Sequence, residues 1–251
     1  MSATVLTQDF DVTTSALDLV HAVANWLCEQ DCFTSVTQNS NGDTIRWENE
    51  SCGINLYNYI KGTNKLVYCS ATTSLTSPSA SGGYTTYSEE TDGETGQKHY
   101  KISAILAMTD NVVLVMLRNG VDTGRAATFL KITSADLGEL RGFASANLSS
   151  TYSGTYRVDY VTNVLLKKPE DAALSNTYIT SLVCDRKAED PEGKLILTPY
   201  YALVPNIQMA PVLIPGLYAE AGSSFPTLQT QFTAGTKTML QVSDRMALDI
   251  T

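Results

Sequence analysis

The sequence predicts a β-rich α+β protein, in which an N-terminal amphipathic helix packs on an antiparallel meander sheet and a β-rich C-terminal region with extended arms follows. Three observations lead to this prediction. The 251 residues include 31 threonines, 22 serines and 13 tyrosines, and Thr and Tyr favour pleated strands. One stretch near the start has helical periodicity. Seven of the eight prolines fall at or after Pro169, in a region better suited to turns and arms than to helices.

Residues 14–30 form the clearest helix of the sequence. Thr14 or Ser15 can cap its N-terminus, and Asp18 lies in the first turn, where a negative charge favours the helix. Its apolar residues recur three and four positions apart and make a single stripe: Ala16, Leu19, Val20, Val23, Trp26 and Leu27. Such a stripe predicts a helix that packs on a sheet.

Four consecutive strands are expected after the helix, at 32–38, 43–49, 52–60 and 65–73. The stretches between them include "NSNG" (39–42) and "KGTN" (61–64), in which Asn and Gly tolerate the positive φ of tight hairpin turns. The pattern therefore predicts a four-stranded antiparallel meander.

Residues 74–97 interrupt this pattern with a long polar loop rich in Ser, Thr, Gly and acidic residues. Two interpretations are open: a mobile loop, or a protruding β-arm that contacts a neighbour. The second is considered because long structured loops are often functional. Tyr84 and Tyr87 lie in it and are candidate interface residues. Tyr152 and Tyr156 are a second candidate tyrosine pair, although packing within strands explains that pair as well.

The most apolar stretch, "KISAILAMTDNVVLVMLRNG" at 101–120, could suggest a membrane anchor. Asp110 at its centre would be costly within a bilayer, and "TDN" is a good turn between two segments of strand length. We therefore expect a buried hairpin. A third strand should follow at 126–133, and "SADLGELRGF" (134–143) predicts a short helix that Ser134 caps and Gly142 ends.

A change of composition near residue 140 predicts a boundary between a domain at 1–140 and a β-rich region at 141–251. Within that region Pro205, Pro211 and Pro215 punctuate residues 205–218. Prolines at intervals of six and four residues argue against a helix or a central strand, so this segment is expected to be an extended arm across a surface. The three prolines join Tyr84 and Tyr87 as candidate interface residues.

The charge balance excludes some classes of partner. A net charge of −9 argues against nucleic-acid binding, which needs clustered Lys and Arg. Five cysteines, an odd number, indicate reduced thiols, and the N-terminus shows no secretory signal. We therefore expect a protein that folds in a cytoplasm and binds neither nucleic acid nor a membrane.

No catalytic residues are assigned. The histidines His21 and His99 are expected to be exposed, and one of them would have to serve as base for any Ser or Cys nucleophile. His21, Cys28, Cys32 and Cys52 make a conceivable metal set, but their spacing matches no zinc pattern, so small buried thiols are expected instead. No metal or cofactor is predicted.

The N-terminal helix ending in "AVANWLCEQ" (22–30), the Thr/Ser-rich meander and the terminal "TKTMLQVSDRMALDIT" (236–251) resemble small virion proteins of tailed bacteriophages, particularly tail-tip or baseplate components. The resemblance implies a non-enzymatic building block. It would be made in the host bacterial cytoplasm and assembled into the virion tail with further copies of itself and neighbouring virion proteins.

Two alternatives remain at the level of the sequence. The first is a carbohydrate- or receptor-binding module that uses exposed Tyr-bearing loops such as 74–97 and binds a glycan. The second is an enzyme that depends on His21 or His99.

Overall fold

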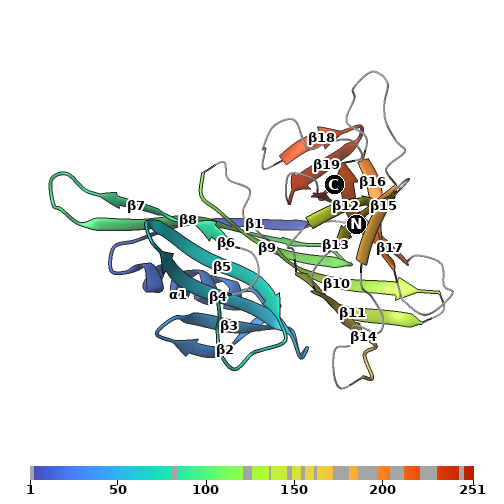
Figure 1. Cartoon of the computed structure of the whole chain (residues 1–251), viewed down its shortest axis with the longest axis horizontal. Helices are drawn as coiled ribbons and strands as arrows, with labels where there is room; N and C mark the ends of the chain where they lie inside the picture. Colours follow the sequence, from blue (N-terminus) through green and yellow to red (C-terminus); the bar gives the residue numbers. More distant parts are fainter. Residues whose placement is uncertain are drawn as a thin grey trace. The chain divides into compact units, whose positions relative to one another are not determined.

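A computed structural model gives the fold of the chain (Figure 1). It describes residues 3–80, 84–120, 126–135, 137–145, 149–153, 156–160, 163–171, 181–185, 197–203, 212–220, 231–242 and 246–251. Within these residues there are 20 strands and one helix, α1, and the sheets are antiparallel wherever their register is known. The predicted β-rich α+β class and the N-terminal helix on a sheet agree with this structure.

The chain divides into two compact units, each made of separate stretches. Unit 1 contains Met1–Val5, Ala107–Leu114 and Thr128–Thr251, and unit 2 contains Leu6–Leu106 and Val115–Ala127. This division differs from the boundary near residue 140 that the sequence predicts, because the segment 107–127 contributes to both units.

Helix α1 (Ala16–Cys28) begins where the sequence predicts. Ser15 is its N-cap, and the Ser15 hydroxyl accepts a hydrogen bond of 3.0 Å from the Asp18 amide. The buried side of α1, which includes Leu19, Val23 and Leu27, packs on β2, β3 and β4. In the described part of the chain, no helix has the length and apolar character needed to cross a bilayer.

The cap gives a first testable expectation. Ser15→Ala should lower the free energy of unfolding by about 1 kcal/mol, because it removes the acceptor for a backbone amide that has no partner within the helix. Ser15→Asn, which can still cap the helix, should lower the free energy of unfolding much less. Urea unfolding monitored by circular dichroism measures both variants, and equal stability of Ser15→Ala and the wild type would contradict this role of Ser15.

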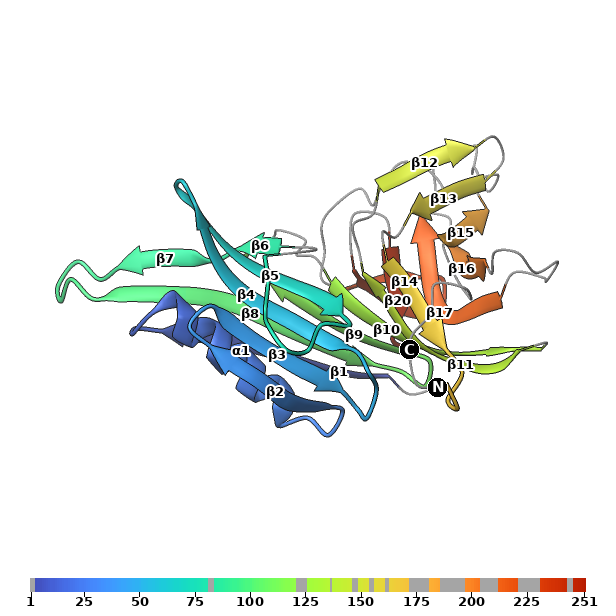
Figure 2. The same ribbon diagram turned by 60° about the horizontal axis from the view of Figure 1, so that its bottom comes forward.

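The predicted meander forms a five-stranded sheet in unit 2. Its strands occur in sequence order: β2 (Phe33–Asn39), β3 (Gly42–Trp47), β4 (Gly53–Lys61), β5 (Asn64–Thr72) and β6 (Tyr84–Thr86). Figure 2 shows α1 against this sheet. Side chains alternate between the two faces, so Ile45, Ile54 and Leu56 lie on the helix-covered face and are fully buried.

A second sheet contains the predicted hairpin. Its strand order is β1 (Thr4–Val12), β8 (Lys98–Met108), β9 (Val112–Arg118), β10 (Ala126–Ser134), β11 (Gly138–Ser145) and β14 (Asn163–Lys167), and β7 (Ser88–Thr91) also pairs with β8. Every residue of β9 is buried, as a hairpin in the core requires. The predicted helix at 134–143 is wrong, because residues 138–145 form the strand β11, of which 141–145 pair with β14.

The third sheet lies in unit 1. Its strand order is β12 (Ser149–Ser153), β13 (Tyr156–Tyr160), β15 (Ser181–Asp185), β16 (Leu197–Leu203), β17 (Val212–Glu220), β20 (Met246–Asp249), β19 (Lys237–Gln241) and β18 (Gln231–Ala234). Its core includes Met239 and Ala247, against which Leu197, Tyr218 and Phe232 pack.

The predicted arm at 205–218 is wrong for its second half. Residues 212–218 lie in β17, which pairs with β16 on one side and β20 on the other. Pro215 is accommodated in this central strand because the register shifts: Tyr201 is opposite Leu213, and Pro199 is opposite Tyr218. Four residues of β17 thus face one residue of β16, and a bulge of this kind tolerates proline. Pro205 and Pro211 lie outside the described residues.

The polar stretch 74–97 is partly strand. It contains β6 and β7 in place of a continuous loop. The carbonyl of Leu75 accepts hydrogen bonds from the hydroxyls of Thr37 (2.9 Å) and Thr44 (2.8 Å), which ties the start of this stretch to the meander sheet.

Candidate functional site

One face of the meander sheet carries a row of tyrosines. Tyr57 is opposite Tyr68 in the register, and Tyr68 is opposite Tyr84, so the three side chains cross β4, β5 and β6 in line. Tyr59 lies two residues after Tyr57 and shares its face. We call this surface the tyrosine face, made up of Tyr57, Tyr59, Tyr68, Tyr84 and Thr86, with the buried Leu66 between Tyr59 and Thr86 in the register.

The four rings contact one another. The ring centroids of Tyr68 and Tyr84 are 5.4 Å apart, and those of Tyr59 and Tyr68 are 6.2 Å apart with nearly perpendicular planes. The ring centroid of Tyr57 is 6.4 Å from those of both Tyr59 and Tyr68. These are favourable tilted and edge-to-face arrangements, so each ring restricts the motion of its neighbours.

The face is open at one end and covered at the other. Tyr84 is 52% exposed and Tyr59 is 37% exposed, large values for aromatic side chains on a sheet. Asn55, two residues before Tyr57, is instead buried and exchanges hydrogen bonds of 2.5 and 2.7 Å with the backbone of Ser79. The segment containing Ser79 therefore covers the sheet up to the edge of the tyrosine row.

The tyrosine face contains no acidic or basic side chain of Asp, Glu, Lys, Arg or His. Partial burial, and then the neighbouring Tyr84 and Tyr59, raise the pKa of Tyr68, so its hydroxyl stays protonated. Leu66 and Thr86 carry no charge. The surface thus combines aromatic rings with hydroxyl groups that donate and accept hydrogen bonds.

The tyrosines that the sequence singles out lie in different environments. Tyr84 lies on the tyrosine face, whereas Tyr87 is only 5% exposed, with its ring 6.1 Å from that of Tyr100, so it is unavailable as a surface residue. Tyr152 and Tyr156 lie on the paired strands β12 and β13. The sequence prediction missed Tyr57, Tyr59 and Tyr68, although their alternation along β4 and β5 was a usable signal.

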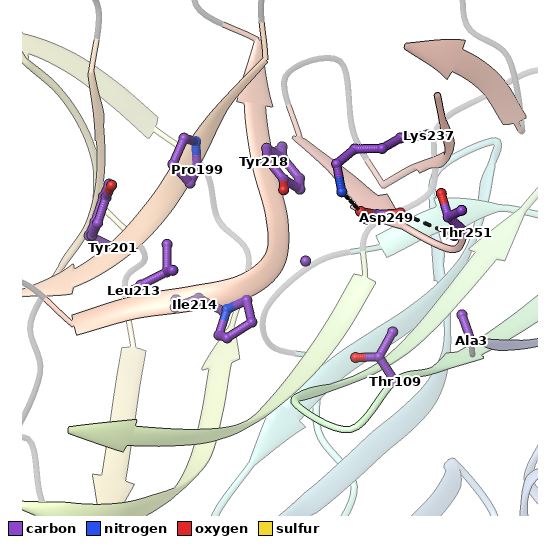
Figure 3. Close-up of a pocket in the computed structure, with 12 residues that line it drawn as sticks. Ala3, Thr109, Pro199, Tyr201, Leu213, Ile214, Tyr218, Lys237, Asp249 and Thr251 are labelled. Carbon is purple, nitrogen blue, oxygen red and sulfur yellow. Dashed lines mark hydrogen bonds and ion pairs between the residues drawn. The ribbon is translucent and has the colours of Figure 1, made fainter. Parts of the chain in front are cut away.

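Unit 1 contains a pocket of about 530 Å³ (Figure 3). Its apolar lining includes Pro199, Leu213 and Pro215, so Pro215, a candidate interface residue, lines a concave site. Its polar lining includes Tyr201, Tyr218, Lys237, Asp249 and Thr251.

An ion pair between Lys237 and Asp249 lies at one side of this pocket, and the Lys237 ammonium is 5.4 Å from the centre of the Tyr218 ring (Figure 3). Burial works against the charge of Asp249, but hydrogen bonds from Lys237 and Thr251 lower its pKa overall. The hydrogen bond to Asp249 raises the pKa of Lys237. Both groups are therefore ionised at neutral pH, and together they are neutral.

His21 was expected to be exposed, and the structure corrects this. Its Nδ1 is 2.8 Å from Oδ2 of Asp43, whose side chain is only 3% exposed, and the His21 side chain is 19% exposed. Burial raises the pKa of Asp43, and the hydrogen bond from His21 opposes that rise. Burial, and then the charge of Asp43, raises the pKa of Cys28 to about 11, so this thiol is protonated and a poor nucleophile at neutral pH.

His99 lies at the surface and pairs with Asp11 at 2.8 Å. Cys28 and Cys32 are half-buried, and Cys52 and Cys69 are buried. Among the described residues, no group of three or more His, Cys, Asp or Glu side chains is placed to hold a metal ion.

No known protein family matches the sequence, and no curated protein matches it significantly.

Proposed function

We propose that the protein is a non-enzymatic structural subunit of a bacteriophage virion, of the tail or baseplate type, and that it assembles with further copies of itself and with neighbouring virion proteins. The observation that carries the assembly role is the tyrosine face. It gathers four aromatic rings on three strands and leaves two of them substantially exposed.

Tyrosine suits a protein interface for physical reasons. Its ring buries a large area at a low cost in side-chain entropy, its hydroxyl satisfies polar partners, and it is enriched among the residues that dominate binding energy. The mutual ring contacts restrict the side chains before binding, which reduces the entropy lost on association.

The net charge of the chain opposes self-association least where the contact surface is neutral, which points to this surface over charged ones. Copies of a protein with a net charge of −9 repel one another, and this repulsion is least where the contact itself is neutral. The tyrosine face provides such a contact.

Light scattering across a concentration series tests the proposal. The wild-type protein should form a discrete oligomer, and the double variant Tyr59→Ser/Tyr84→Ser should weaken its association by about 100-fold or more, since each central aromatic side chain typically contributes about 2 kcal/mol. Ile60→Ser is the matched control, because Ile60 is 61% exposed on the same strand but on the opposite face. A monomer at every concentration, or equal effects of the two changes, would count against assembly through the tyrosine face.

The exposed ring of Tyr84 also favours the second candidate, a carbohydrate- or receptor-binding module. In that case a monomer would bind a glycan, and Tyr84→Ala would abolish binding without changing the mass in solution.

A further inference from the structure

The pocket of unit 1 owes its shape to the bulge in β17. β17 has four residues, Ile214 to Leu217, between the paired positions Leu213 and Tyr218, whereas β16 has only Tyr200 between the corresponding Tyr201 and Pro199. Gly216 has a φ of +83°, a conformation that glycine adopts without strain. The strand therefore bends here, as the curved ribbon of β17 in Figure 3 shows, and residues of this bend line the pocket.

The wall of the pocket offers two kinds of contact. Leu213 is 45% exposed, and Pro199, Pro215 and the half-buried rings of Tyr201 and Tyr218 add further apolar surface. Lys237 and Asp249 place a hydrogen-bond donor and an acceptor side by side. The Thr251 hydroxyl accepts a hydrogen bond of 2.9 Å from the Thr238 amide, and the Thr251 amide donates one of 3.1 Å to Oδ1 of Asp249.

We propose that this pocket binds a neutral saccharide, with a sugar face against Tyr218 and Leu213 and vicinal hydroxyl groups on the Lys237–Asp249 pair. A hydroxyl donates to a carboxylate and accepts from an ammonium, so two adjacent hydroxyls match the pair. The apolar C–H face of a pyranose matches the aromatic and aliphatic wall.

Other ligand classes match this chemistry less well. The ion pair is neutral as a whole, so the attraction of one partner for a charged ligand is offset by repulsion from the other. A fully apolar ligand would strip water from both charges without replacing their hydrogen bonds. The pocket volume of about 530 Å³ falls within the range usual for small-ligand sites, which is roughly 300–1,000 Å³. This site is independent of the tyrosine face and of the assembly role proposed above.

An array of neutral and anionic oligosaccharides, followed by saturation-transfer NMR on the sugars retained, tests the proposal. The full chain should retain neutral hexose or N-acetylhexosamine oligomers. Tyr218→Ala should weaken their binding by at least about tenfold, whereas Tyr218→Phe, which keeps the ring, should bind nearly as the wild type does. Leu213→Ser alters an exposed side chain and should weaken binding even if Tyr218→Ala proves unstable. Thermal unfolding of each variant establishes that it is folded.

Three results would overturn the proposal: no retention of any neutral sugar, retention of anionic sugars alone, or unchanged binding in folded Tyr218→Ala and Leu213→Ser. Tyr84→Ser serves as the control for location, because it alters the tyrosine face and should leave this binding intact. Loss of sugar binding in Tyr84→Ser alone would move the glycan site to the tyrosine face.

Discussion

Replacement of His21 by alanine should lower the free energy of unfolding by about 3 kcal/mol. Asp43 lies beneath α1 with its side chain almost fully buried, and His21 is bonded to its Oδ2. Among the described residues, Oδ1 of Asp43 has no hydrogen-bond partner. Removal of His21 would leave a buried carboxylate without its charge-assisted bond, and such losses typically cost about 3–5 kcal/mol. The partial exposure of His21 places the expected cost at the low end, because water can enter the gap.

Urea unfolding followed by tryptophan fluorescence measures this effect, since Trp26 and Trp47 both belong to unit 2. The double variant His21→Ala/Asp43→Asn is the matched control, because it removes the charge together with its partner, and it should recover part of the loss. Equal stability of the single and double variants at neutral pH would show that the charge of Asp43 is not the cause.

The difference between these two variants should depend on pH. Burial raises the pKa of folded Asp43 above its ordinary value of 3.8. A carboxyl group with a raised folded pKa binds more protons in the folded state, so its ionisation destabilises the fold as pH rises from the unfolded value through the folded one. The deficit of His21→Ala relative to the double variant should therefore grow with pH in that window and become constant above it.

Gly53→Ala should also cost about 3 kcal/mol, for a steric reason. A Cβ at Gly53 would lie 1.9 Å from the carbonyl oxygen of Ile45 and 2.8 Å from the Cα of Arg46, which is its register partner on β3. Both atoms are backbone atoms, so β3 and β4 would have to separate, and overpacking of this kind costs about 1–3 kcal/mol or more. The same sheet carries the tyrosine face, so this change should weaken self-association as well.

Gly93→Ala is the control for this prediction. Apart from its chain neighbours, no atom of the described residues lies within 4 Å of a Cβ at Gly93, so the free energy of unfolding should change by less than about 0.5 kcal/mol. The same fluorescence-monitored urea unfolding compares both variants, and a Gly53→Ala protein as stable as Gly93→Ala would show that the two strands separate at little cost.

Local patterns in the sequence were sufficient to predict several elements. The apolar stripe and the Ser15 cap predicted α1, which runs from Ala16 to Cys28 inside the expected 14–30. The turn residues at 39–42 and 61–64 predicted the meander, and Asp110 distinguished a buried hairpin from a membrane anchor. In each case the determining interactions lie within a few residues, so neighbouring residues carry the signal.

The errors arose where distant residues decide the structure. The capping pattern after Ser134 indicated a helix, but pairing of 141–145 with β14 makes a strand. The prolines around 205–218 indicated an arm, but the bulge opposite Tyr200 places Pro215 in a central strand. Local preferences of about 1 kcal/mol are easily outweighed by a full ladder of backbone hydrogen bonds and the burial that accompanies it.

The candidate sites show the same division. The sequence by itself determined that β4 and β5 would alternate their side chains, which puts Tyr57 and Tyr59 on one face, and that the chain would be acidic and rich in hydroxyl groups. Only the tertiary structure decided that α1 covers the other face, that Tyr84 completes the row while Tyr87 is buried, and that Lys237 meets Asp249 beside Tyr218. The physical reason is that alternation defines two faces, whereas the packing of distant segments determines which face remains open to a partner.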